Sequence, residues 1–426
     1  MKKNYLTFIL VFSVVSRLVV AFFFGNGVEI LPGTFDQVSY HNLALRLLDG
    51  YGFSFAEPWW PLTDAGEPTA HWSFLYTFYL TAVYFIFGPN PLVARIIQVI
   101  IVGLLQPYLV YLIGRHLFDE RVGLVAAGLT AVYIYFIYYA ATLMTEPFYI
   151  TAILAVLYLA LRFGEVAPAQ EYRLALLLGV VLVLTIHLRQ LFLLFVPFLF
   201  LWILWRRYDL GNPLPFMPLV LMIGLVIGSI LPFTYYNYQR FDQVVLLNTN
   251  AGFAFFWANH PVYGTRFHPI LPPELGNYLE LVPRELRDLD EAELEQALLQ
   301  RGLQFIFDDP GRYIMLSLSR IPVYFTFWPT ADSSLASNLA RLASFGLLFP
   351  FMLYGAAKFL WQRSVWDWLR HPAFLLLLFG TVYTAVHILI WALIRYRLPV
   401  DAVMLIFAAI ALLDIPVLRE IVIKAE

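Results

Sequence analysis

Apolar residues gather in runs of about 20 along most of the chain, and short polar or basic stretches separate them. A helical run of that length matches the thickness of the hydrocarbon core of a bilayer. The pattern therefore predicts about ten membrane-crossing helices, at residues 5–24, 92–114, 122–139, 148–161, 174–187, 191–205, 215–233, 339–360, 372–391 and 398–413.

Two further apolar segments, 71–87 and 313–328, are short or amphipathic. The basic hinge around Arg115 and Arg121 is expected on the cytoplasmic side, which makes the preceding span, 92–114, descend from outside. Segment 71–87 then cannot cross completely, and we expect both segments to lie in the membrane interface. If both crossed instead, the chain would have twelve spans.

Basic residues also set the orientation of the chain. Lys2 and Lys3 place the N-terminus in the cytoplasm by the positive-inside rule. Arg17 interrupts the first apolar run and no small-residue cleavage site follows it, so we interpret this run as an uncleaved first span. Both termini are then inside, and the segments 26–90 and 235–312 are extracytoplasmic.

Helical signals appear within these outer segments. Residues 36–48 show helical spacing of leucines, typical of an amphipathic interfacial helix. Asp290 followed by Glu293 resembles a capping box, which predicts a helix from there to about Asp308. We divide the chain into a first transmembrane module with the first outer loop (1–234), an extracytoplasmic loop region (235–312) and a C-terminal transmembrane module (313–426).

Composition supports an integral membrane protein. Of 426 residues 61% are hydrophobic and 13% are charged, and mean hydropathy is +0.73, whereas soluble domains carry about 25% charged residues. The net charge of −2 gives no basic field for nucleic acid. The absence of cysteine excludes disulfides, thiolate metal sites and thiol catalysis.

Two carboxylates at outer ends of spans are candidate catalytic residues. Asp36 follows the first span, where it would accept a proton from an incoming hydroxyl or amine. Asp36 also opens a predicted helix, and the pattern alone favours a helix cap. Glu146 would bind an acceptor or orient a donor, but the pattern alone slightly favours an acid in the first turn of a helix, with Pro147 at the first helical position.

Basic residues on the same side are candidates for binding a phosphate. Arg395 and Arg397 flank Tyr396, and two guanidiniums can grip a phosphate through paired hydrogen bonds. Arginines near a helix end can also simply extend to the interface. We add Arg189 and His71 as candidate hydrogen-bond donors to the phosphate, although single histidines are more often structural. Substrate contacts are expected from Tyr40, Asn250 and Tyr396.

No HExxH, P-loop, GxSxG or dinucleotide fingerprint occurs, and no clear cluster of metal ligands is visible. We therefore expect no obligatory cofactor, and we leave a divalent metal undecided.

The order and spacing of several stretches resemble the GT-C superfamily of membrane glycosyltransferases. The nearest branches are the dolichyl-phosphate-mannose–protein mannosyltransferases and the bacterial aminoarabinose transferases of lipid A. The likeness rests on FDQVSYHNLALRLLDGYGFSF, PTAHWSFLYTFYLTAVYFIFGPNPLVARIIQ, LVYLIGRHLFDERVGLVAAGLTAVYIYFIYYAATLMTEPF, LNTNAGFAFFWANHPVYG, GLQFIFDDPGRY and RYRLPVDAVMLIFAA.

The resemblance implies an all-α polytopic GT-C fold, a polyprenyl-phosphate-linked sugar as donor, and inversion. By position, Asp36 matches the catalytic Asp of the first loop and Glu146 the acidic residue of the second. Arg395 and Arg397 fall where basic residues meet the lipid phosphate. Gln37 stands where protein mannosyltransferases often have Glu, which leaves a lipid, glycan or protein acceptor open.

We expect a multi-pass protein of the plasma (inner) membrane, surrounded by membrane lipids, with its site facing the periplasm or cell exterior. One alternative is a polytopic transporter or a flippase of lipid-linked sugars. Such proteins place functional charges near the bilayer midplane, often within inverted repeats, whereas the candidates here cluster at one face and no repeat is evident. A non-catalytic scaffold subunit is the third reading.

Overall fold

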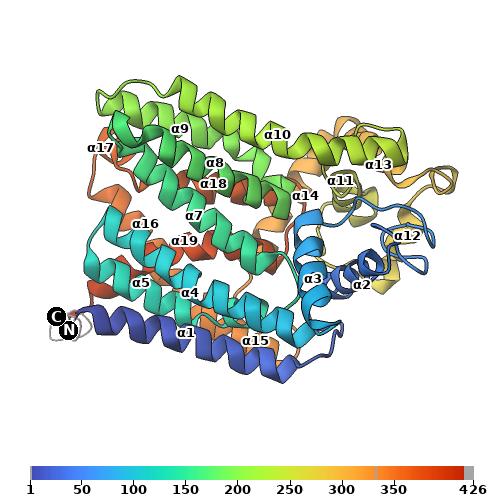
Figure 1. Cartoon of the computed structure of the whole chain (residues 1–426), viewed down its shortest axis with the longest axis horizontal. Helices are drawn as coiled ribbons and strands as arrows, with labels where there is room; N and C mark the ends of the chain where they lie inside the picture. Colours follow the sequence, from blue (N-terminus) through green and yellow to red (C-terminus); the bar gives the residue numbers. More distant parts are fainter. Residues whose placement is uncertain (1, 332, 417–426) are drawn as a thin grey trace.

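The computed structural model describes residues 2–331 and 333–416, and these residues are organised almost entirely as helices (Figure 1). The α-helices are α1 (Lys2–Phe24), α2 (Asp36–Leu48), α3 (Phe74–Phe87), α4 (Pro91–Leu117), α5 (Glu120–Val132), α6 (Ile134–Ala140), α7 (Glu146–Glu165), α8 (Glu171–Leu188), α9 (Val196–Asp209), α10 (Phe216–Phe241), α11 (Ala251–Asn259), α12 (Tyr278–Leu281), α13 (Glu291–Asp308), α14 (Pro310–Tyr324), α15 (Leu335–Arg341), α16 (Leu347–Trp361), α17 (Val365–Arg370), α18 (Phe374–Leu389) and α19 (Ile394–Leu413). Short turns of other helix types are η1 (Pro168–Gln170), η2 (Gln190–Leu194), η3 (Pro261–Tyr263), η4 (Pro273–Leu275), η5 (Arg284–Leu286) and η6 (Leu342–Gly346).

Each of the ten predicted crossing segments contains helix, so the chain is a multi-pass membrane protein as expected. Among the described residues, seven helical segments are long and apolar enough to cross, or eight if the bent pair α5–α6 is one span. The helices α9 and α18 hold 14 and 16 residues, below the length of a typical span. These two short helices account for the difference between the eight long apolar spans and the ten spans that hydropathy predicts.

Helices α5 and α6 are bent by 57° relative to each other, and a side chain of α1 hydrogen-bonds the backbone at this bend. A break in a helix frees carbonyl groups that the bilayer core cannot hydrate. Arg17, fully buried, donates to the carbonyls of Thr130 and Ala131, both at 3.3 Å. The charge that interrupts the first apolar run therefore stabilises the broken span beside it.

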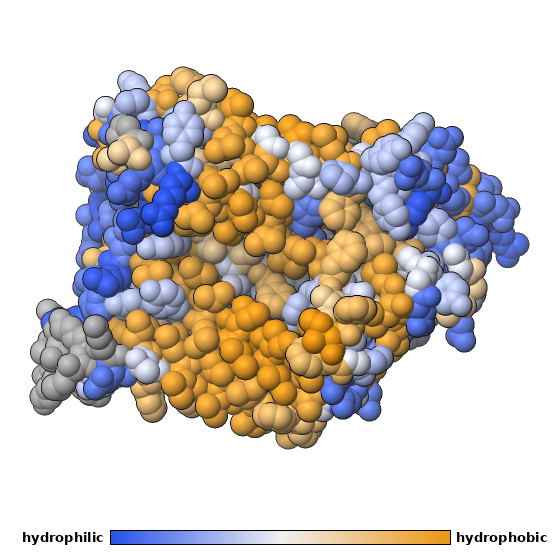
Figure 2. Space-filling model, in the orientation of Figure 1, coloured by the Kyte–Doolittle hydropathy of each residue, from blue (hydrophilic) through white to orange (hydrophobic). Residues whose placement is uncertain are grey.

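The long helices form a bundle with a broad hydrophobic belt between two hydrophilic ends (Figure 2). The start of α1 and the end of α19 lie at one end, whereas α2, α3, α11, α12 and α13 lie at the other (Figure 1). Burial differs strongly among the spans: 72% of the apolar stretch is buried in α7 and in α19, but 17% in α1. The core of the bundle therefore contains α7 and α19, and α1 faces outward.

The first outer loop folds as the sequence predicts at α2, whose bounds match the predicted helix. Helix α3 has 14 residues, too few to cross a bilayer, and it runs across the direction of the long helices (Figure 1). Segment 71–87 therefore has the arrangement of an interfacial helix.

The large outer segment braces this loop. Asp290 caps α13 by accepting from the backbone N–H of Glu293 at 2.8 Å, which confirms the predicted helix start. The next residue, Glu291, is buried and accepts hydrogen bonds from Thr63 Oγ1, the Ala70 N–H and Thr249 Oγ1 at 2.8, 2.7 and 2.5 Å. One carboxylate thus ties the first loop to the segment that begins α11.

Candidate active site

Asp36 begins α2 but does not cap it. The N-cap position belongs to Phe35, and no side chain provides a capping hydrogen bond there. Instead, Oδ2 of Asp36 lies 2.9 Å from Nη1 of Arg395, and the Asp36 side chain remains 20% exposed. The helix-cap explanation that the pattern favoured is therefore wrong, because the carboxylate is turned toward a cation on α19.

Arg395 joins the two candidate carboxylates. It lies in the first turn of α19, where its Nη1 also donates to the carbonyl of Gly33 at 3.2 Å. Its Nε is 3.6 Å from Oε1 of Glu146. Two carboxylates near one another repel, and a guanidinium between them offsets that repulsion. Residues from the first loop, the second loop and the final helix thus meet at one side chain.

Glu146 has a second guanidinium partner, Arg189. Glu146 opens α7 with a side chain that is 3% exposed, and it forms an ion pair with Arg189 Nη2. Arg189 follows α8 in an extended conformation and donates from Nε to Thr145 Oγ1 at 2.9 Å. The other oxygen of Glu146, Oε2, is buried without a hydrogen-bond partner.

Tyr396 lies against both guanidiniums of this cluster. The Cζ atoms of Arg189 and Arg395 are 5.4 and 5.2 Å from its ring centroid. Its ring stacks on His387, with centroids 4.9 Å apart and planes at 24°. Since an aromatic face attracts a cation, Tyr396 holds the two arginines near each other. Tyr396 thus packs against the two arginines and His387, and its carbonyl accepts from the Tyr324 hydroxyl at 3.4 Å.

Arg397 is not brought to this cluster. Residues two apart on a helix point to different sides, and Arg397 is fully buried, with Nε 2.9 Å from Oδ1 of Asp401. Its Nη1 donates to the Tyr324 carbonyl at 2.6 Å, and Tyr133 donates to Asp401 at 2.8 Å. The expectation that Arg395 and Arg397 grip one phosphate does not fit this geometry. Asp401 lies four residues after Arg397, a spacing that already indicates an ion pair along one helix face.

Arg397→Met is expected to reduce the free energy of unfolding by about 3–5 kcal/mol, because it leaves the Asp401 carboxylate buried and unpaired. Thermal unfolding of the purified protein in detergent measures this loss. Adding Asp401→Leu should restore most of the stability. The double variant should keep its activity, and a stable but inactive double variant would show that Arg397 takes part in the reaction.

His71, Tyr40 and Asn250 lie around the first loop. Asn250 donates to the His71 carbonyl at 3.3 Å, and the Tyr40 hydroxyl accepts from the Ser73 N–H at 3.4 Å. His71 Nδ1 is buried without a partner. Burial lowers the pKa of the His71 imidazole, while the carboxylates of Glu291 and Asp36 act in the opposite direction. His71 therefore lies in the field of Asp36, and Asn250 supports its backbone.

Arg95 positions both loops and was not among the predicted site residues. It is fully buried on α4 and donates to the carbonyls of Gly25, Gly27 and Ala141 at 2.7, 2.8 and 2.9 Å, and to Gln37 Oε1 at 3.3 Å. These acceptors lie after α1, beside Asp36, and shortly before Glu146. An arginine inside an otherwise apolar span is the signal that marks it.

Arg95→Gln is expected to lower kcat by about 100-fold with a smaller change in KM, because small displacements of reacting groups have effects of that size. Initial rates and thermal unfolding should be measured on the same preparation, with Arg95→Lys as the partial rescue. A kcat that falls only in proportion to the folded fraction would contradict a positioning role.

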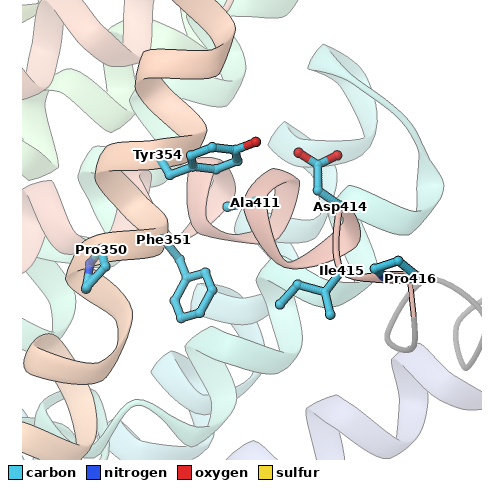
Figure 3. A pocket seen from close by; sticks show the side chains of 7 residues that line it. All are labelled: Pro350, Phe351, Tyr354, Ala411, Asp414, Ile415 and Pro416. Carbon is cyan, nitrogen blue, oxygen red and sulfur yellow. The ribbon is translucent and has the colours of Figure 1, made fainter.

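A cavity lies between α16 and the end of α19, and Figure 3 shows the residues that line it. It measures about 440 Å³ and is lined by Pro350, Phe351, Tyr354, Ala411, Asp414, Ile415 and Pro416. Arg395 and Asp414 stand at opposite ends of α19, about 30 Å apart for a helix of that length. Asp414 is paired with Lys358 at 2.5 Å. We assign this cavity no part in the candidate site.

Within residues 2–331 and 333–416, no three His, Asp or Glu side chains come together as a metal-binding group. The candidate site is thus a cluster of two carboxylates and two guanidiniums, Asp36, Glu146, Arg189 and Arg395, at the end of the bundle that carries α2 and α3.

Comparison with known proteins identifies the fold. Residues 71–235 match the family model described as Dolichyl-phosphate-mannose-protein mannosyltransferase. The archaeal oligosaccharyltransferase AglB from Archaeoglobus fulgidus, in complex with an inhibitory peptide and a dolichol-phosphate, matches with a TM-score of 0.59 and 17% identity over 100% of this chain and 52% of that chain. The apo form of the Archaeoglobus fulgidus oligosaccharyltransferase gives a TM-score of 0.58 and 18% identity over the same shares. ArnT from Cupriavidus metallidurans in the apo state gives 0.47 and 11% identity over 96% of this chain and 60% of that chain.

No curated protein matches the chain by sequence. The family match and the likeness to AglB confirm the GT-C fold and the resemblance to membrane glycosyltransferases. The chain spans about half the length of the oligosaccharyltransferase it matches.

Proposed function

We propose that this chain, whose residues 71–235 match the dolichyl-phosphate-mannose-protein mannosyltransferase family, is a glycosyltransferase that uses a polyprenyl-phosphate-linked sugar. The observation that carries the proposal is the 2.9 Å contact between Asp36 and Arg395 beside the pair of Glu146 and Arg189. It puts a candidate base next to two candidate phosphate-binding groups. The acceptor is a lipid, a glycan or a protein on the extracytoplasmic side.

The chemical step needs one base and one site for the leaving group. Asp36 accepts the proton of the acceptor hydroxyl or amine, and the freed lone pair attacks the anomeric carbon. The bond from that carbon to the phosphate oxygen breaks, and the polyprenyl phosphate leaves with the electron pair. Arg395 and Arg189 stabilise the charge that develops on the phosphate. Attack opposite the leaving group inverts the anomeric configuration.

The resting ion pair implies an order of events. In the resting site, Nη1 of Arg395 bonds Asp36 and Nε of Arg395 lies 3.6 Å from Glu146. A donor phosphate binds Arg395 by competing with Asp36, and this competition releases the Asp36 carboxylate to act as a base. Glu146 keeps Arg189 as its partner and so remains compensated. Donor binding therefore precedes proton transfer.

Charge distribution supports a site on the extracytoplasmic side. The last turns of α4 and α9 carry Arg115, His116, Arg206 and Arg207. Basic residues near span ends favour the cytoplasm, and the alternation of the spans puts the candidate site at the opposite end. This placement retains the sequence-based orientation with both termini inside.

Reconstituted vesicles supplied with polyprenyl-phosphate hexoses or pentoses test the proposal. The expected result is release of polyprenyl phosphate together with a glycosylated acceptor from the vesicle or from added peptide. Asp414→Asn, at the far end of α19, is the matched control and should turn over normally. Movement of intact donor across the bilayer without release of polyprenyl phosphate would instead identify a flippase.

A further inference from the structure

A groove separate from the candidate site lies between α2, α3 and α10. It measures about 300 Å³ and is lined by Leu47, Phe53, Phe78, Pro232, Phe233 and Tyr236. Phe78 is 43% exposed, so the groove opens to the surroundings of the bundle. The ring of Phe53 lies 5.4 Å from that of Phe78 and 6.2 Å from that of Tyr236, which joins the walls. Such a lining suits a hydrocarbon chain.

Two arginines stand beside this apolar lining. The guanidinium of Arg240 lies 4.2 Å above the Tyr236 ring and donates to the carbonyl of Phe53 at 3.4 Å. Arg46, next to Leu47, donates to the hydroxyl of Ser54 at 3.0 Å and lies 4.0 Å above the ring of Tyr51. Arg240 therefore contacts two residues of the groove lining, and Arg46 directly precedes a third, Leu47.

Neither charge is compensated by an ion pair within the described part of the chain. The Nε atoms of Arg46 and Arg240 are buried without a hydrogen-bond partner. Glu291 contributes a favourable field at Arg240, but its carboxylate is already bonded to Thr63, Ala70 and Thr249. Arg240 also donates from Nη1 to the Thr69 carbonyl at 3.2 Å and from Nη2 to Asn237 Oδ1 at 2.8 Å, whereas Arg46 bonds Ser54 alone through Nη2. Two cations without an acidic partner beside an apolar groove match the chemistry of a phosphate that carries a hydrocarbon tail.

We infer that the groove between α2, α3 and α10 binds an anionic phospholipid of the surrounding membrane. One acyl chain lies against Phe78 and Phe233, and the headgroup phosphate bonds Arg46 and Arg240. Electrostatic attraction to anionic lipid falls off within a Debye length, so a guanidinium acts on the headgroup only from close to the groove, where Arg240 contacts Phe53 and Tyr236. This lipid site is independent of the transfer reaction.

The lipid proposed for the groove is too far from Asp36 to be the sugar donor. A donor phosphate must reach Arg395, which contacts Asp36 at the start of α2. Leu47 lies near the other end of α2, about 16 Å along the helix axis. A phosphate held by Arg46 is therefore too far from Asp36 to be the leaving group. A lipid in the groove also borders the helix that carries Asp36.

Photoactivatable phosphatidylglycerol in phosphatidylcholine vesicles tests the inference with the intact protein. Wild type is expected to be labelled on the order of tenfold more than with a photoactivatable phosphatidylcholine probe, with crosslinks at Phe53, Phe78 and Tyr236. R46Q/R240Q should abolish the preference, and R46K/R240K should restore part of it. Arg284→Gln with Arg301→Gln, both exposed in the outer segment, is the matched control and should label as wild type.

A second variant keeps the test valid if Arg240 is needed for folding. R46Q alone removes one of the two guanidiniums that bind the phosphate, and it should reduce the preference for phosphatidylglycerol several-fold. Phe233→Trp should fill the groove and reduce labelling although both arginines are present. Equal labelling by the two probes would overturn the inference. So would unchanged labelling of the R46Q/R240Q variant, or displacement of phosphatidylglycerol by equimolar polyprenyl phosphate.

Discussion

Asp36→Asn is expected to lower the rate of sugar transfer by about 100-fold to 10,000-fold, because an amide cannot accept the acceptor proton. The substitution preserves the shape of the side chain. Arg395 keeps its contact with Glu146 and its hydrogen bond to the Gly33 carbonyl. Stability should therefore change little, whereas the donor should bind more tightly, because an amide competes less well than a carboxylate for the Arg395 guanidinium. The measurement is the initial rate of polyprenyl phosphate release at saturating donor, with binding of a labelled donor followed separately.

Asp49→Asn is the matched control for this substitution. Asp49 ends the same helix as its C-cap residue and is exposed. We expect its variant to transfer sugar at the wild-type rate. Full turnover by Asp36→Asn would remove Asp36 as the base. An equal loss in the Asp49 variant would show that the defect comes from the charge of α2 and not from proton transfer.

Arg395→Gln is expected to lower kcat by about 100-fold to 1,000-fold, the range seen when one donor to a developing charge is removed. KM for the donor should also rise, since the guanidinium bonds the phosphate before reaction. The loss leaves Asp36 without its 2.9 Å partner and Glu146 with Arg189 alone. Steady-state rates over a range of donor concentrations separate the two parameters.

Two comparisons make this prediction specific: the conservative variant Arg395→Lys, and the loss of the neighbouring Arg397. Lysine keeps the charge but cannot offer two parallel donors, so Arg395→Lys should recover part of kcat. The neighbouring guanidinium of Arg397 has 0% exposure and an acidic partner on its own helix. Its loss should lower stability, whereas the loss of Arg395 should lower turnover. A reversed pattern would contradict the assignment of the two arginines.

Local pattern determined most of the helices. The leucine spacing in 36–48 predicts α2 with the bounds it has in the structure, and Asp290 predicts the start of α13. These signals succeed because apolar periodicity and capping depend on residues within a few positions of one another. Length was less decisive for α9 and α18, where hydropathy predicts full spans and the helices hold 14 and 16 residues.

The sequence by itself also marked Asp36, Glu146, Arg189 and Arg395 as candidates, because they lie near the outer ends of apolar runs and because Asp36 and Glu146 match the acidic loop residues of the family that the chain resembles. Tertiary structure alone decided which of them meet. Asp36 and Arg395 come from opposite ends of the chain, and helical rotation turns Arg397 away toward Asp401. Arg95 shows the same limit, since its acceptors include backbone carbonyls of two separate segments, Gly25 and Gly27 after α1 and Ala141 before α7, which no side-chain pattern reveals.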